Sequence, residues 1–333
     1  MKKIMLRWIS EGYSFWDLAC YACGCCEGWH TSFCSWRSNS CIAVATCRQC
    51  GAKQFLKKYH KAGDAVKSVA QSQWEYEVLG HLDGGNRSGL LFRVPRAYNF
   101  AAKTSALSME YVQGESMDER MRHARDRQRL DDCLRISAAW LRGLHAASPI
   151  YDKTGNGHAS MLRRLESDCR SLAARNRMVA QALTCMRCSS DKVNSLPAER
   201  VPLHGDFKPS NLMWTSGGVY GIDIGLRFKN PGVMDAAQFV ANVLLNRGGI
   251  PAIAGEHDVA LILDVFLEAY GDNSQPTRNL TAWWLLYFLL SRWEEDLDGW
   301  KPSMFVDLNY AAAVADAMSF CESIGLLASP VNQ

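Results

Sequence analysis

The sequence predicts an α+β protein with two lobes, a small antiparallel sheet followed by a mainly helical part. β-prone runs separated by a turn occur within residues 41–59, whereas most of the chain beyond the first third is patterned as helix. The 333 residues, 48% of them hydrophobic, are enough for two cores. We therefore expect a Cys-rich N-terminal extension over 1–30, an N-lobe over 31–112 and a C-lobe over 113–333.

Composition excludes several other classes. A net charge of +3 favours neither nucleic acid nor an anionic membrane as a partner. The most apolar segment, Trp283 to Leu290, is too short to cross a bilayer and predicts a buried helix. The N-terminus begins like a signal peptide, but Arg7, Glu11 and Asp17 interrupt the apolar core that such a peptide needs. We expect a cytoplasmic protein.

The first elements form a predicted hairpin and a helix. Residues 41–46 and 54–59 are β-prone, and a polar turn at 48–51 separates them. The second strand carries Lys57 and Lys58. Adjacent strand residues face opposite sides, so only one of the two can face a binding site. The alternative is a solvated basic edge strand.

Residues 64–82 follow with apolar side chains at helical spacing. Glu75 and Glu77 both lie on this helix. Next, residues 105–112 form a strand-like run that gives way to Gly114. A linker to the second lobe is expected here, although a plain strand end has the same pattern.

The strongest motif is His-Gly-Asp-Phe-Lys-Pro-Ser-Asn over residues 204–211, followed by Asp223 between two isoleucines. A His-Gly-Asp tripeptide alone would predict only a turn. Here two short apolar runs around a Ser-Gly-Gly turn follow it, which predicts a β-hairpin with Asn211 at its start and Asp223 at its end. An Asp, an Asn five positions later and a second Asp flanked by apolar residues are the spacing of a phosphoryl-transfer centre.

These residues resemble the aminoglycoside phosphotransferase and choline kinase superfamily, small-molecule kinases with a protein-kinase-like fold. The resemblance covers most of the chain, is weak at the N-terminus and is strong over residues 50–245. It implies ATP and Mg²⁺ as cofactors, with Asp206 as the catalytic base and Asn211 and Asp223 as metal ligands. Lys208 is expected to contact the γ-phosphate.

The resemblance also implies roles for the N-lobe. Lys57, and not Lys58, would bind the α- and β-phosphates and pair with Glu75, whereas Glu77 would be solvated. Residues at the linker would contact adenine. The phosphate-covering loop departs from the Gly-rich pattern of protein kinases and has a polar sequence instead. The further nucleotide-binding candidates are Ser38, Asn39, Ser40, Met109 and Tyr111.

Two features favour a small acceptor over a protein. Only eleven residues separate Asp223 from Asp235, too few for a peptide-binding activation segment. Gly205 also replaces the arginine that in protein kinases binds a phosphorylated activation loop. We therefore expect transfer to a hydroxyl of an aminoglycoside, amino alcohol or sugar. The alternatives are a protein-kinase-like enzyme and a pseudokinase that binds nucleotide as an interaction module.

The C-terminal helices form the acceptor pocket in the resembled family. Here they carry aromatic and acidic side chains, which would suit a cationic acceptor, but a core helix with a solvated acidic end explains the same pattern and is the favoured interpretation. These side chains are Trp283, Trp284, Tyr287, Trp293, Trp300, Glu294, Glu295, Asp296 and Asp298. Two further predictions are that His145 is a packed structural histidine and that Asp235 caps a helix and braces the catalytic loop.

Thirteen cysteines are many for a cytoplasmic enzyme, and eight lie between Cys20 and Cys50. Residues 20–24 and 47–51 both have the Cys-x-x-Cys-Gly form of a zinc knuckle, but the 23 residues between the pairs exceed the usual spacing. His30 and Cys34 are further candidate ligands. Free cysteines are also ordinary small core residues, and we favour this interpretation over a structural Zn²⁺. Cys185 and Cys188 are expected within a helix.

Overall fold

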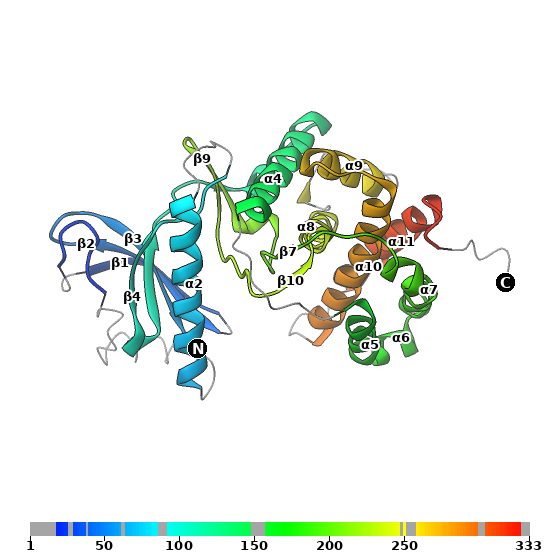
Figure 1. Ribbon diagram of the computed structural model, residues 1–333, viewed down its shortest axis with the longest axis horizontal. Helices are drawn as coiled ribbons and strands as arrows, with labels where there is room; N and C mark the ends of the chain where they lie inside the picture. The colour runs from blue at the N-terminus through cyan, green and yellow to red at the C-terminus, as the bar shows by residue number, and fades with distance from the viewer. Residues whose placement is uncertain are drawn as a thin grey trace. The chain divides into compact units, whose positions relative to one another are not determined.

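The computed structural model describes residues 18–25, 29–37, 39–60, 64–85, 92–147, 157–246, 249–250, 258–298 and 304–327 (Figure 1). These residues form two compact units. The first contains the described residues up to 85 together with Arg93–Gly114, and the second contains Phe92 and the described residues from Glu115 onward. The fold is α+β, with a small antiparallel sheet in the first unit and mainly helices in the second, as predicted.

The first unit contains a five-stranded sheet in the order β1-β2-β3-β5-β4, in which every neighbouring pair is antiparallel. The predicted hairpin is present as β2 and β3. The edge strands β1 and β4 were not predicted, because their side chains are mostly exposed or half-buried and lack a clear apolar alternation. The strands are β1 (Trp29–Trp36), β2 (Ser40–Cys47), β3 (Lys53–Tyr59), β4 (Ala97–Ala101) and β5 (Ala106–Glu110).

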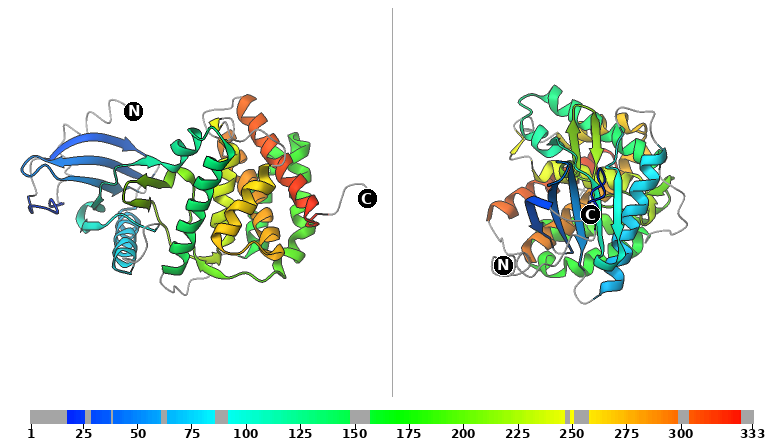
Figure 2. Two further views of the ribbon diagram at one scale, coloured as in Figure 1. Left: turned by 90° about the horizontal axis from the view of Figure 1, so that it is seen from above. Right: turned by 90° about the vertical axis from the view of Figure 1, so that its left-hand side faces the viewer.

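Helix α2 (Ala65–Gly85) covers one face of this sheet, against β3, β4 and β5 (Figure 2). Its start is fixed by Asp64, whose side chain accepts the backbone N–H of Lys67 at 2.9 Å. Leu79 and Leu82 are buried on its inner face. The predicted helix over 64–82 is therefore confirmed. A short 3-10 helix η1 (Ala102–Thr104) connects β4 to β5.

The second unit contains two small sheets. The predicted second hairpin is present as β8 and β9, and β6 extends it to three strands; β7 pairs with β10. The 3-10 helix η2 (Pro209–Asn211) leads into β8, so Asn211 stands at the start of the hairpin as expected. The strands are β6 (Glu115–Ser116), β7 (Arg200–Pro202), β8 (Leu212–Thr215), β9 (Gly218–Gly221) and β10 (Lys229–Pro231).

Helix α10 is the centre of the helical part and contacts α5, α7, α8 and α11. Its middle is apolar on all sides, as expected of a helix surrounded by others. Among the described residues, every helix is too short or too polar to span a bilayer. The helices of this unit are α3 (Met117–Arg122), α4 (Arg127–Ala147), α5 (His158–Asp168), α6 (Arg170–Arg175), α7 (Arg177–Asn194), α8 (Val233–Leu245), α9 (Asp258–Tyr270), α10 (Gln275–Asp298) and α11 (Met304–Ser323). Cys185 and Cys188 lie in α7, as predicted.

Candidate functional site

Residues 204–211, here called the catalytic loop, connect β7 to η2 and carry the strongest sequence motif. The carboxylate of Asp235 on α8 holds the backbone of this loop in place. It accepts the backbone N–H of His204 at 2.7 Å and that of Gly205 at 3.1 Å. It also lies 3.1 Å from Nε2 of His145, whose Nδ1 is 2.8 Å from the hydroxyl of Tyr270. The loop backbone is therefore held by a buried carboxylate from a neighbouring helix.

This arrangement tests two sequence predictions. His145 is a buried, hydrogen-bonded structural residue, as predicted. Asp235 braces the catalytic loop, but the prediction that it caps a helix is wrong. The residue that precedes α8 is Gly232, which has no side-chain cap. The Asp235 carboxylate cannot do both, because it points to the loop and not to the amides of its own first turn.

Aromatic rings pack beneath the catalytic loop. The Phe207 ring is fully buried, stacks on Trp140 at a centroid distance of 5.9 Å and contacts Phe239 at 5.0 Å. His204 packs against the same rings, and burial lowers its pKa below the ordinary value. A neutral His204 accepts the backbone N–H of Asp206 at Nδ1, at 3.3 Å. These contacts fix the backbone on both sides of Asp206.

The Asp206 side chain is half-exposed and bonded to two partners within the loop. Its Oδ2 lies 2.6 Å from Nζ of Lys208 and 3.1 Å from Nδ2 of Asn211. The same Nδ2 donates to the backbone carbonyl of Asp206 at 2.8 Å. Because the amide nitrogen of Asn211 is used in this way, its oxygen is the atom that can serve a metal ion.

Asp223 is held close to this loop by backbone hydrogen bonds on either side of it. The N–H of Ile222 donates to the carbonyl of Asn211 at 2.9 Å, and that of Gly225 donates to the carbonyl of His204 at 2.8 Å. A Cβ at Gly225 would lie 2.8 Å from that carbonyl oxygen, so the close approach requires glycine. Asp223 has a φ of +60°, a conformation that Asp tolerates better than most residues. The structure thus gathers Asp206, Asn211 and Asp223, as the spacing predicted.

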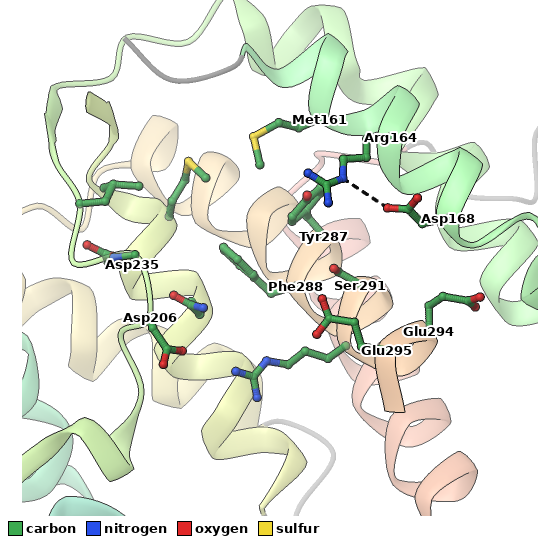
Figure 3. Close-up of a pocket in the computed structure, with 15 residues that line it drawn as sticks. Met161, Arg164, Asp168, Asp206, Asp235, Tyr287, Phe288, Ser291, Glu294 and Glu295 are labelled. Carbon is green, nitrogen blue, oxygen red and sulfur yellow. Dashed lines mark hydrogen bonds and ion pairs between the residues drawn. The ribbon is translucent and has the colours of Figure 1, made fainter. Parts of the chain in front are cut away.

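A pocket of about 640 Å³ opens beside Asp206 (Figure 3). The catalytic loop, α5, α8 and α10 supply its walls. Five carboxylates and two guanidinium groups line it, so it carries negative charge. Its lining residues are Met161, Arg164, Asp168, Leu203, Gly205, Asp206, Met234, Asp235, Gln238, Tyr287, Phe288, Ser291, Arg292, Glu294 and Glu295.

The C-terminal residues singled out in the sequence divide between this pocket and the core. Tyr287, Glu294 and Glu295 line the pocket. The tryptophans do not: Trp283, Trp284 and Trp293 are at most 1% exposed and belong to the hydrophobic core, as in the favoured interpretation. Asp296 instead accepts the hydroxyl of Tyr310 at 2.5 Å. Trp300 and the side chain of Asp298 lie outside the described residues.

Both cations of the pocket were missed by sequence reasoning. Arg164 pairs with Asp168 on α5 at 3.5 Å, and Arg292 on α10 donates to Asn242 of α8 at 2.7 Å. An Arg and an Asp four residues apart in a polar helix predict only a solvated pair, and nothing in the sequence around Arg292 marks it. Their place in the site depends on how the helices pack.

In the first unit, Lys57 and Glu75 form a buried ion pair. Nζ of Lys57 lies 2.9 Å from Oε1 of Glu75, and both residues are at most 5% exposed. Tyr59 donates its hydroxyl to the other carboxylate oxygen, and burial together with Glu75 raises its pKa. Glu77 is exposed and bonded to Gln73. The pairing expected of Lys57 and Glu75 is therefore present.

The other nucleotide-binding candidates lie at two places in the first unit. Asn39 is exposed in the turn between β1 and β2, Ser40 begins β2 and is buried, and Ser38 lies outside the described residues. Met109 is a buried residue of β5, and Tyr111 follows the end of that strand, with Nζ of Lys53 5.8 Å from its ring centre. Their contacts with nucleotide stay predictions.

A catalytic loop with these carboxylates, beside a helical pocket and joined to a small antiparallel sheet, defines a phosphotransferase of kinase-like fold. Residues 38–223, more than half of the chain, match the Phosphotransferase enzyme family, and the protein belongs to that family. No curated protein sequence matches the chain significantly.

Solved structures agree on the fold. A putative aminoglycoside phosphotransferase from Ralstonia eutropha is 12% identical, with a TM-score of 0.58 over 99% of both chains. A choline/ethanolamine kinase family protein from Mesorhizobium loti is 14% identical, with a TM-score of 0.56 over 89% of this chain and 91% of the other. Amicoumacin kinase hAmiN, solved with AMP-PNP, Ca²⁺ and Ami, is 12% identical, with a TM-score of 0.56 over 87% and 88%.

Proposed function

We propose that this phosphotransferase moves the γ-phosphoryl group of ATP, held with Mg²⁺, to a hydroxyl of a small cationic molecule of the amino alcohol or aminoglycoside type. The observation that carries the proposal is the position of Asp206 in the wall of an acidic pocket. A base beside a pocket of about 640 Å³ suits a small acceptor. An excess of carboxylates favours a positively charged one.

Each residue has a defined part in this reaction. Asp206 accepts the proton of the acceptor hydroxyl, whose oxygen forms a bond to the γ-phosphorus as the bond to the bridging oxygen of ADP breaks. The oxygen of Asn211 and the carboxylate of Asp223 would hold Mg²⁺, which would neutralise charge on the phosphates. Lys208 contacts the transferred group. In the first unit, Lys57 binds the α- and β-phosphates and Glu75 holds it in place. The AMP-PNP and Ca²⁺ in the amicoumacin kinase structure support a nucleotide with a divalent ion in this fold.

The test is an ATP-consumption screen over aminoglycosides, amino alcohols, neutral sugars and nucleosides, with the Asp206→Asn variant as control. Turnover is expected with cationic acceptors. Asp206→Asn should lower kcat about 10²- to 10⁴-fold while the Kd for ATP stays unchanged. Preference for a neutral sugar would contradict the acceptor class. ATP binding with no acceptor at all would instead indicate a nucleotide-binding interaction module.

A matched pair of variants tests the charge of the pocket. Glu295 lines the pocket, whereas its neighbour Asp296 is bonded to Tyr310 and does not. Glu295→Gln should raise KM for a cationic acceptor roughly twofold to fivefold, the size expected of an exposed ion pair, and Asp296→Asn should leave KM unchanged. Equal effects of the two variants would argue against recognition by the pocket carboxylates.

A further inference from the structure

Four cysteines of the first unit, outside the residues assigned to phosphoryl transfer, meet at one point. The Sγ atoms of Cys20, Cys23, Cys47 and Cys50 all lie within 4.8 Å of one another. Sγ of Cys20 is 3.5 Å from that of Cys50, and Sγ of Cys23 is 3.7 Å from that of Cys47. Sulfurs about 2.3 Å from a tetrahedral zinc ion are about 3.8 Å apart. The four sulfurs are thus spaced as the corners of a metal site.

The two Cys-x-x-Cys-Gly segments have the same backbone conformation. The N–H of Gly24 donates to the carbonyl of Cys20 at 2.8 Å, and the N–H of Gly51 donates to that of Cys47 at 2.9 Å. Gly24 has a φ of +73° and Gly51 of +75°, a region that favours glycine, while the space beside each is open. The glycines therefore serve the turn itself. Two equivalent turns face each other with their cysteines inward.

Backbone amides are directed at the sulfurs in both turns. The N–H of Cys25 donates to the sulfur of Cys23, and the N–H of Ala52, at the equivalent position, donates to that of Cys50. The N–H of Cys50 also donates to the sulfur of Cys47. Hydrogen bonds of this kind orient the sulfur atoms, as the outer shell of a metal site does.

Core packing does not explain the cluster. Cys20 and Cys47 are buried, but Cys23 and Cys50 are exposed, and an exposed cysteine is not a core residue. The long spacing between the pairs has a structural reason. Strands β1 and β2 lie between them, so the chain leaves the first turn, forms a complete hairpin and returns to place the second turn beside the first. The spacing that argued against zinc in the sequence is the length of this hairpin.

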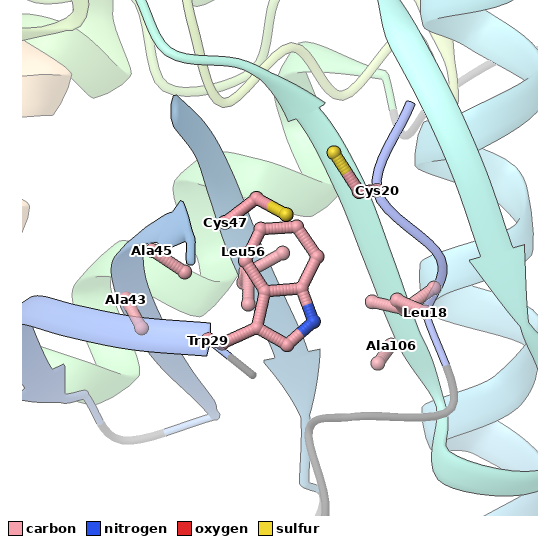
Figure 4. Packing of buried hydrophobic residues seen from close by; sticks show 8 residues of the cluster. All are labelled: Leu18, Cys20, Trp29, Ala43, Ala45, Cys47, Leu56 and Ala106. Carbon is pink, nitrogen blue, oxygen red and sulfur yellow. The ribbon is translucent and has the colours of Figure 1, made fainter. Parts of the chain in front are cut away.

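The cluster joins the N-terminal segment 18–25, which has no regular secondary structure, to the sheet. Leu18 and Trp29 belong to one buried cluster on the sheet, in which Trp29 lies toward Ala43 and Ala45 and Leu18 lies beside Ala106 (Figure 4). Hydrogen bonds also fix the segment to the sheet, such as that from Nδ2 of Asn99 to the carbonyl of residue 19 at 2.9 Å. Because this apolar contact is small, a cross-link between the segment and the sheet would stabilise their association.

We propose that Cys20, Cys23, Cys47 and Cys50 bind one structural zinc ion that fastens segment 18–25 to the β2–β3 turn. Four cysteines complete the tetrahedral coordination and leave no position for a substrate, as in structural sites. The other candidate ligands lie elsewhere: His30 is exposed on β1, and Sγ of Cys34 is 3.6 Å from Sγ of Cys41.

The experiment measures metal in the purified full-length protein by mass spectrometry of the elements, without nucleotide or acceptor. We expect about one zinc ion per chain in the wild type and in a Cys34→Ser control, and none in the double variant Cys23→Ser/Cys50→Ser. Reconstitution with Co²⁺ should give the visible absorption of tetrahedral thiolate coordination in the first two proteins only.

If the double variant fails to fold, the same question can be answered by removing the metal from the wild-type protein with a chelator. Four additional thiols should then react with a thiol reagent, and zinc should restore their protection. Wild-type protein without zinc, equal zinc in the double variant, or disulfides joining these cysteines in peptide mapping would each overturn the proposal. None of these results depends on the proposed reaction.

Discussion

The Oδ2 atom of Asp235 accepts the backbone N–H of His204 at 2.7 Å, and this bond joins helix α8 to the catalytic loop. The bond is fully buried, since Asp235 is 1% exposed and His204 is 0% exposed. A hydrogen bond between a charged acceptor and a buried donor is stronger than one between neutral groups. The position of Asp206 therefore depends on Asp235, a residue that has no chemical role in the proposed reaction.

Asp235→Asn is expected to destabilise the protein by about 2–3 kcal/mol, because an amide has one acceptor oxygen for two loop N–H groups and turns its own donors toward them. Activity should fall as well, through kcat more than through KM. Asp132→Asn is the control, since its pairing with Arg135 on the surface of α4 is exposed, and it should change the free energy of unfolding by less than about 0.5 kcal/mol. Chemical denaturation and steady-state kinetics measure both. An unchanged kcat in Asp235→Asn would show that the loop keeps its position without this brace.

Lys57→Met should weaken ATP binding roughly tenfold or more, because a charge-assisted contact with phosphate is lost. The single substitution also leaves the charge of Glu75 buried without its partner. The double variant Lys57→Met/Glu75→Gln removes both charges and is expected to fold better, so it is the preferred test. Lys58→Met is the matched control, one position along the strand on the opposite face, and should change the Kd less than threefold. Isothermal titration with ATP and Mg²⁺ checks this. Equal losses in the Lys57 and Lys58 variants would contradict the assignment.

Stability is expected to fall with acid below about pH 6.5. Burial lowers the pKa of His204 and of His158, so the unfolded chain takes up protons there that the folded protein does not. Above the ordinary histidine pKa both states are neutral and the contribution is constant. Below it, each such residue lowers the free energy of unfolding by up to ~1.4 kcal/mol per pH unit. His204→Asn should flatten the slope between pH 5 and pH 6.5, and an unchanged slope would contradict the prediction. Urea unfolding at several pH values decides between these outcomes.

Gly221→Ala should destabilise the second unit by about 1–3 kcal/mol. An added Cβ would lie 2.0 Å from the ring of Trp140, which is fully buried beneath Phe207. Gly80→Ala on α2 provides the contrast, because a Cβ there meets nothing within 4 Å and alanine favours the helix, so a gain of about 0.4–1 kcal/mol is expected. Thermal denaturation of the two variants should shift in opposite directions.

The helices and strands that have a clear local sequence pattern could be predicted from the sequence. The hairpins around Lys57 and Asn211, helix α2 and helix α4 (Arg127–Ala147) all follow from alternating or helical apolar spacing together with turn residues. The ion pair of Lys57 with Glu75 was predicted from the family resemblance, and the structure contains it. These contacts join neighbouring elements.

The pocket was not predictable in the same way. Arg164, Gln238 and Arg292 come from three helices that are distant in the sequence, and each is an ordinary polar helix residue until the helices assemble. The two cysteine pairs were visible in the sequence, but the reason for the long spacing between them was not. That reason is strand β1, an edge strand with too little apolar alternation to be predicted.

Gly205 has a consequence for how this enzyme can evolve. Its φ of +84° disfavours any residue with a side chain, although the space beside it is open. An arginine at this position would have to accept a strained backbone of about 1–2 kcal/mol next to Asp206, the proposed catalytic base. A single codon change is therefore a poor route to an activity switched on by phosphorylation.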